Sequence, residues 1–99
     1  MPPLGRLVGI LISAQHSADA FEIGYKLSKK ANILSSAGIT LYGPAPAPIA
    51  RVRGRYRVRM LLKASNAVSM QSVIKLWLSG LNLRKDTRLV IDVDPQSFL

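Results

Sequence analysis

The central stretch of the chain alternates between basic and apolar residues. It reads RVRGRYRVRMLLK over residues 51–63, with arginine at all five odd positions from 51 to 59. Side chains alternate across a β-strand with a period of two, so a strand would send these guanidinium groups to one face and pack Tyr56 in the core. A helix would scatter them and leave no apolar stripe. The pattern predicts a strand, regular from about Arg55 to Ala64, with one basic side and one core side.

Two further stretches have apolar residues at helical spacing. The first, residues 18–34, carries acidic side chains near its start and lysines near its end, as the helix dipole favours. We expect Ser17 to be its N-cap and Gly24 to mark a point of close approach on its apolar stripe. The second helix is expected within residues 66–80, with Trp77 as a core anchor.

Three other short segments have the pattern of strands. Residues 7–13 form a continuous apolar run, typical of a buried central strand. Residues 39–42 predict a second strand, and residues 87–94 alternate like a last strand that Pro95 stops. In GPAPAP, residues 43–48, proline at every second position fixes φ and removes backbone donors. We expect this segment to be a stiff, extended connection, because it cannot be a helix or an inner strand.

The predicted element order is β-α-β-β-α-β. This order is typical of a ferredoxin-like α+β plait, in which two helices cover one face of a four-stranded antiparallel sheet. If the first and third strands are central, the arginines lie on the open face. Asp92 and Asp94 would point to that face from the last strand, ~9.5 Å from the arginines with the first strand between them. The arginines should therefore stay largely available to a partner.

Positive charge is concentrated in the arginine strand. The 99 residues predict a single domain, residues 1–99, with a formal net charge of +9. Residues 51–63 hold six positive charges and no negative one. Such a cluster favours a polyanion or an acidic protein surface as partner. Arginine is typical of sites that bind phosphate or carboxylate, whereas lysine would serve if the charge only kept the strand face soluble. The candidate binding residues are Arg51, Arg53, Arg55, Arg57, Arg59 and Lys63.

The sequence lacks the residue patterns of catalytic and metal sites. His16 is the sole histidine, cysteine does not occur, and there is no G-x-x-x-x-G-K-[ST] phosphate loop. Small basic acylphosphatases share the predicted topology, but SAQHS at residues 13–17 stands where they carry a glycine-rich phosphate loop. No apolar run approaches the ~20 residues that span a bilayer. We therefore expect no enzyme activity, no cofactor and no membrane partner, and the lack of cysteine fits a cytoplasmic location.

Several separated motifs resemble one known family. GPAPAP at 43–48, RGRYR at 53–57 and DVDP at 92–95 are similar, in this order, to the C-terminal domain of bacterial primosomal protein N′, the replication-restart helicase PriA. PPLGRL at 2–7 resembles that family's entry into the domain. Val58 departs from the family, which often has tryptophan there, and this departure argues against base stacking at that position.

The resemblance implies a fold, a role and partners. The family domain has a fold likened to ribosomal protein S10 and is thought to help bind branched DNA at abandoned replication forks. The chain would be an excised C-terminal domain of a longer ATP-driven 3′–5′ helicase, whose other parts would hold the family's ATP, Mg and Zn. The implied partners are forked or branched DNA, without sequence specificity, and the helicase core. Single-stranded DNA-binding protein is a further candidate, and the implied location is the bacterial cytoplasm, at the nucleoid.

Three hypotheses follow for the arginine strand. The first is a non-catalytic DNA-binding accessory domain that acts in replication restart and repair. The alternative is a protein-interaction domain whose arginines dock on the helicase lobes or on the acidic tail of single-stranded DNA-binding protein. A more remote alternative is an S10-like RNA-binding module. They differ in whether the domain prefers DNA, an acidic peptide or RNA at equal ionic strength.

Overall fold

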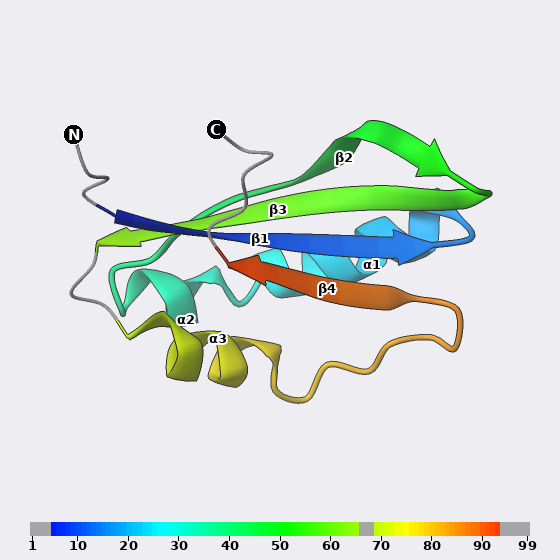
Figure 1. Ribbon diagram of the computed structural model, residues 1–99. Coiled ribbons are helices and arrows are strands. Elements are labelled where there is room, and N and C mark those ends of the chain that lie inside the picture. Colours follow the sequence, from blue (N-terminus) through cyan, green and yellow to red (C-terminus); the bar gives the residue numbers. More distant parts are fainter. Residues whose placement is uncertain (1–4, 66–68, 94–99) are drawn as a thin grey trace.

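Within residues 5–65 and 69–93, the part of the chain that this computed structural model describes, a four-stranded antiparallel sheet is layered on three helices (Figure 1). The elements in chain order are β1 (Gly5–Ala14), α1 (Ser17–Ser28), α2 (Ala31–Ser35), β2 (Thr40–Val52), β3 (Arg55–Ser65), α3 (Met70–Leu78) and β4 (Arg88–Val93). None of these helices is long and apolar enough to cross a membrane, in the part of the chain described.

The strand order is β2-β3-β1-β4, and each neighbouring pair is antiparallel. The apolar run of β1 and the alternating strand β3 are therefore central, as predicted. The helix α1 packs against β1, β2 and β3, whereas α3 packs mainly against α2. All helices lie on the same side of the sheet, and within the described residues the other face is open (Figure 1). The predicted α+β plait is confirmed, with three helices where the sequence predicts two.

Alternate residues of β1 and β3 point into the core between the sheet and the helices. The fully buried strand residues include Val8, Ile10 and Ile12 of β1 and Val58, Met60 and Leu62 of β3. Trp77 of α3 is also fully buried, and its indole Nε1–H donates to the Leu27 carbonyl of α1 at 3.0 Å. The bond satisfies the polar atom of the indole, so Trp77 is the core anchor that the sequence predicts.

The long helix predicted over residues 18–34 is wrong, because it is interrupted at Lys29 and Lys30. Lys30 has φ −102° and ψ 17°, outside the helical region. Two residues earlier, the Ser28 hydroxyl donates to the Tyr25 carbonyl at 2.8 Å, alongside the Lys29 N–H at 3.1 Å, and such side-chain bonds often accompany a bend in a helix. The break redirects the chain so that Leu34 of α2 is fully buried.

The predicted helix ends also differ from the observed ones. The first helix begins at Ser17 itself, so the N-cap is His16, which makes no side-chain capping bond. The prediction of Ser17 as the cap is wrong by one residue. The helix α3 is shorter than the predicted range 66–80, of which residues 66–68 lie outside the described part.

The proline segment 43–48 lies inside β2 and does not form a separate connection. Pro46 pairs with Val58 of β3, and the register shifts between Tyr42 and Ala45 and again between Pro46 and Arg51. An edge strand tolerates proline because its outward side needs no backbone donor. The segment is therefore extended, as predicted, but it belongs to the sheet.

Gly24 marks the contact between α1 and this edge strand. A Cβ atom built on Gly24 would lie 2.7 Å from Cβ of Pro44, closer than real atoms approach. The predicted close approach is confirmed, and its partner is the proline segment.

We predict that Trp77→Phe destabilises the fold by about 2–3 kcal/mol. The change removes one of the two donors to the Leu27 carbonyl, which keeps the Lys30 N–H at 3.0 Å, and it opens a cavity in the core. Urea unfolding followed by circular dichroism measures this loss. Leu76→Ala is the matched control, since Leu76 is the exposed neighbour on α3, and it should change the free energy of unfolding by less than about 1 kcal/mol. Equal effects of the two substitutions would contradict the anchor role.

Candidate nucleic-acid interface

A two-residue turn divides the arginine stretch between two strands. Arg53 and Gly54 have φ of 51° and 76°, as a type I′ hairpin turn requires, and glycine adopts such values without strain. Arg51 on β2 therefore pairs with Tyr56 on β3, and residues that pair across strands share a face. The prediction that all five arginines line one strand face is wrong for Arg51 and Arg53. The turn breaks the alternation that the sequence pattern suggests.

The open face keeps a shorter basic row along β3. Its members are Arg55, Arg57, Arg59 and Lys63, in which the three arginines are half-buried and the lysine is exposed. The row would advance by ~6.7 Å between successive arginines. This row is the predicted basic side of the strand, and binding by its residues stays a prediction.

The registers of β1 with β3 and β4 arrange the open face in crosswise rows. Arg57 lies opposite Ser13 of β1, which in turn lies opposite Arg88 of β4. In the neighbouring row, Arg59 lies opposite Leu11 of β1, which in turn lies opposite Val90 of β4. Arg88 is exposed and adds a basic group that the candidate set lacks. The alternation of residues 87–94 could have placed it, because Arg88 and Asp92 have the same parity.

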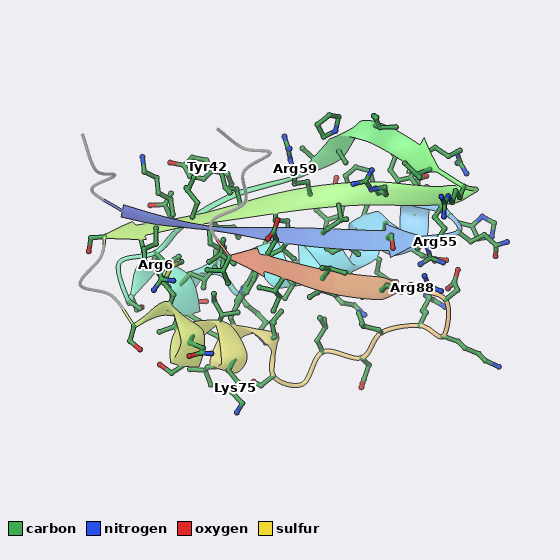
Figure 2. The ribbon with its side chains drawn as sticks, in the orientation of Figure 1. Arg6, Tyr42, Arg55, Arg59, Lys75 and Arg88 are labelled. Carbon is green, nitrogen blue, oxygen red and sulfur yellow. The ribbon has the colours of Figure 1, made fainter. Side chains whose placement is uncertain are left out.

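Arg55 has a structural role that its place in the row does not reveal. Its Nη2 donates to the Ser13 carbonyl at 2.9 Å, to Ser13 Oγ at 3.2 Å and to the Asp86 carbonyl. Asp86 lies in the segment before β4, and its Oδ2 accepts the Gln15 N–H at 3.2 Å. Arg55 thus ties β3 to the end of β1 and to the entry of β4. Figure 2 shows Arg55 and Arg88 at the same end of the sheet.

Arg57 and Arg59 border a groove of about 400 Å³ on the open face. Gly9, Leu11 and Val90 contribute to its floor, and Ala47 to Ile49 of β2 line it from the other side. Arg57 Nη1 donates to the Ile49 carbonyl at 3.4 Å, which holds its guanidinium beside the groove. The groove therefore combines apolar surface with two arginines and one carboxylate, that of Asp92.

Arg51 and Arg53 extend the basic surface to the hairpin tip. Both are exposed, and the Arg51 guanidinium lies 5.8 Å from the ring centroid of Tyr56, within cation–π range. Tyr56 packs partly buried against the core, with its ring 6.0 Å from that of Phe21, as the sequence predicts. The six predicted residues therefore occupy one β2–β3 hairpin but not one face.

Asp92 lies on the open face opposite Gly9, so β1 separates it from β3 as predicted. Asp94 lies outside the described residues. Among residues 5–65 and 69–93, no three His, Asp or Glu side chains are grouped so that they could hold a metal ion.

We predict that Arg55→Lys lowers the free energy of unfolding by about 1–2 kcal/mol. Lysine keeps the charge but cannot make the forked bonds to Ser13 and Asp86. Urea unfolding measures the change, with Arg57→Lys as the control, because Arg57 makes a single long bond to the Ile49 carbonyl. A loss no larger than that of the control would mean that Arg55 is not structural.

Comparisons with known proteins agree with the motifs. The model of the family described as the primosomal protein N C-terminal domain matches residues 1–96. A protein of Rickettsia conorii named replication restart protein PriA is 31% identical over 98 residues, which cover 99% of this chain and 15% of that protein. The protein of that name from Haemophilus influenzae is 31% identical over 100 residues and is matched over 13% of its length. The chain thus spans about 15% or less of these relatives.

Among solved structures, the de novo designed protein Foldit4 has a similar fold. Its TM-score is 0.64 over 93% of this chain and 98% of that one, at 11% sequence identity, which supports the fold alone. The family match over nearly the whole chain confirms the resemblance seen in the motifs. The chain belongs to the family of primosomal protein N C-terminal domains.

Proposed function

We propose that this chain is a non-catalytic DNA-binding domain of a replication restart protein. The observation that carries the proposal is the basic surface of the β2–β3 hairpin and the open sheet face. It comprises Arg51, Arg53, Arg55, Arg57, Arg59 and Lys63, with Arg88 added from β4. The relatives' name, replication restart protein, favours DNA over other polyanions.

The geometry favours contacts with phosphate rather than with bases. The arginines of β3 stand on a sheet face that carries no helix among the described residues, so this face offers no helix to a major groove. Phosphate contacts position DNA without reading sequence. We therefore propose that the domain recognises a DNA structure, a fork or another branch, and acts in replication restart and repair at the nucleoid.

The remainder of a longer protein would supply the enzyme chemistry. The chain spans about 15% of its Rickettsia relative, so ATP-driven helicase activity, with the ATP, Mg and Zn that the family resemblance implies, is proposed for other segments. The domain would then hold DNA for the helicase core, which is its proposed partner within the same protein.

A second candidate function has its own observation, the groove beside Arg57 and Arg59. Apolar surface flanked by two guanidinium groups, which outnumber the single carboxylate of Asp92, suits an acidic peptide that also carries apolar side chains. The acidic tail of single-stranded DNA-binding protein is a candidate of this chemistry. DNA remains the first proposal, because Arg51, Arg53 and Arg88 lie outside the lining of this groove.

We predict that the domain binds labelled fork DNA with a strong salt dependence, measured by fluorescence anisotropy against duplex, single strand and RNA. The double variant Arg57→Ala, Arg59→Ala should reduce the slope of log K against log [salt] by about 2, one for each lost phosphate contact. Preference for RNA over DNA at equal ionic strength would favour the S10-like alternative.

The control removes the same charge from the helical side. Lys26 and Lys29 are exposed on α1 and its C-cap, behind the sheet, so the variant Lys26→Ala, Lys29→Ala should leave the slope within about 0.5 of the wild type. If both double variants weaken binding equally, only net charge matters and the arginine assignment is wrong.

We also predict the outcome of competition. An acidic peptide with apolar residues should displace fork DNA only at a large excess if DNA is the main ligand of the open face. Peptide binding that is tighter than DNA binding at equal salt, and that is lost in Leu11→Asp, would make the groove a protein-docking site instead.

A further inference from the structure

The two edges of the sheet are built differently. At the edge formed by β2, Pro44, Pro46 and Pro48 lack backbone donors, and the register is shifted twice. Such features prevent another strand from pairing with an edge. At the other edge, β4 contains no proline and pairs with β1 without a shift. In the part of the chain that the structure describes, the sheet therefore offers β4 as its edge for a further strand.

The core side of β4 is only partly covered. Ile91 and Val93 pair with Ile10 and Val8, so they point to the helical side of the sheet. Their partners are buried, whereas Ile91 is 42% and Val93 is 54% exposed. An edge strand with unpaired backbone groups and exposed apolar side chains favours association with another chain.

The position of α3 explains the exposure. This helix packs against α2, and a groove of about 860 Å³ separates it from β4. The apolar lining of the groove includes Val8, Met70, Ile74, Leu78, Ile91 and Val93. The connection from α3 to β4 does not fill the groove, because Arg84 is anchored to Asp19 and Glu22 of α1 at 3.5 and 3.4 Å.

We propose that β4 is a docking strand for an extended, acidic and apolar segment of a partner protein. The segment would pair with the free edge of β4 as a fifth, antiparallel strand. Every second side chain would enter the groove over Ile91 and Val93, and the others would lie on the open-face side. This mode of recognition takes affinity from main-chain hydrogen bonds and specificity from the pockets for alternate side chains.

Charge selects the partner. Lys75 lines the groove on α3, Arg88 begins β4 on the open face, and the chain has a net charge of +9. An acidic segment is attracted by this field, whereas a second copy of the chain would bring another +9 to the same edge. Within the strand, a carboxylate opposite Arg88 would form a favourable cross-strand pair, and a neutral residue suits the position opposite Asp92. The site does not rest on the proposed DNA function, because it uses the strand edge and the helical side.

The test uses a fluorescein-labelled peptide with the sequence Thr-Val-Thr-Val-Glu-Val-Glu-Val and an amidated end. In an antiparallel strand its valines would face the groove and its glutamates would lie toward Arg88. We expect saturable binding to the 99-residue chain, with amide NMR shifts concentrated in β4 and α3. Methylating the peptide nitrogens on the pairing edge should abolish binding, and replacing glutamate with lysine should weaken it.

The matched variants are Val93→Lys and Val90→Lys. Both residues are 54% exposed on the same strand, but Val93 faces the groove and Val90 faces the open side. Val93→Lys should weaken peptide binding at least about tenfold, a change that corresponds to ~1.4 kcal/mol. Val90→Lys should leave it unchanged or tighten it, because the new lysine lies on the side of the peptide's glutamates.

Three results would overturn the proposal. The first is a lack of binding up to ~1 mM peptide, where affinity is negligible for a specific site. The second is NMR shifts centred on the arginines of β3, which would place the peptide in the open-face groove. The third is a mass that doubles with concentration in sedimentation equilibrium and returns to the monomer in Val93→Lys, which would make a second copy the occupant.

Discussion

The antiparallel pairing of β1 with β3 determines where every side chain of the open face lies. The ladder runs without interruption from Gly5 opposite Ser65 to Ala14 opposite Tyr56. A slip of one residue would turn the arginines of β3 toward the helices and bury their charge without partners, which is costly. The hydrophobic core and the basic surface are therefore specified by the same alternation. The fold is held by apolar residues, but the charged residues exclude the competing register.

The open face mixes two kinds of surface because β1 is central. Its side chains there are Leu7, Leu11 and Ser13, flanked by arginine on β3 and by Val90 and Arg88 on β4. Basic groups are thus separated by apolar ones, which lowers their mutual repulsion and lets the aliphatic stems of arginine pack. Half-buried guanidinium groups on a rigid sheet lose less conformational entropy on binding than freely moving ones.

Sequence patterns predicted the layers, the central strands, the core side of Tyr56 and the burial of Trp77, because these depend on periodicity. They did not predict the turn at Arg53 and Gly54, since the alternation of arginine continues through it and only backbone conformation interrupts it. The break at Lys30 accompanies the burial of Leu34, which periodicity alone does not reveal, and the bond of Arg55 to Asp86 joins residues distant in the chain. The alternation of residues in β4 would have identified Arg88 as an open-face residue, because it shares a face with Asp92. The prediction included only the dense arginine cluster of residues 51–63. The family was predicted from short motifs at separate places in the chain, such as GPAPAP and RGRYR. The hydrophobic pattern predicts a fold but does not identify a family.

The proline-bearing edge has a consequence for the size of any assembly. A sheet that can be extended at both edges can add strands without limit, and this is how fibrils grow. Here Pro44, Pro46 and Pro48 close one edge. Two copies that pair through their β4 edges would therefore form a sheet that ends in a proline-bearing edge on both sides. Even mistaken pairing would give a closed pair of molecules and no fibre, so an apolar strand edge can be kept exposed at little risk of polymerisation.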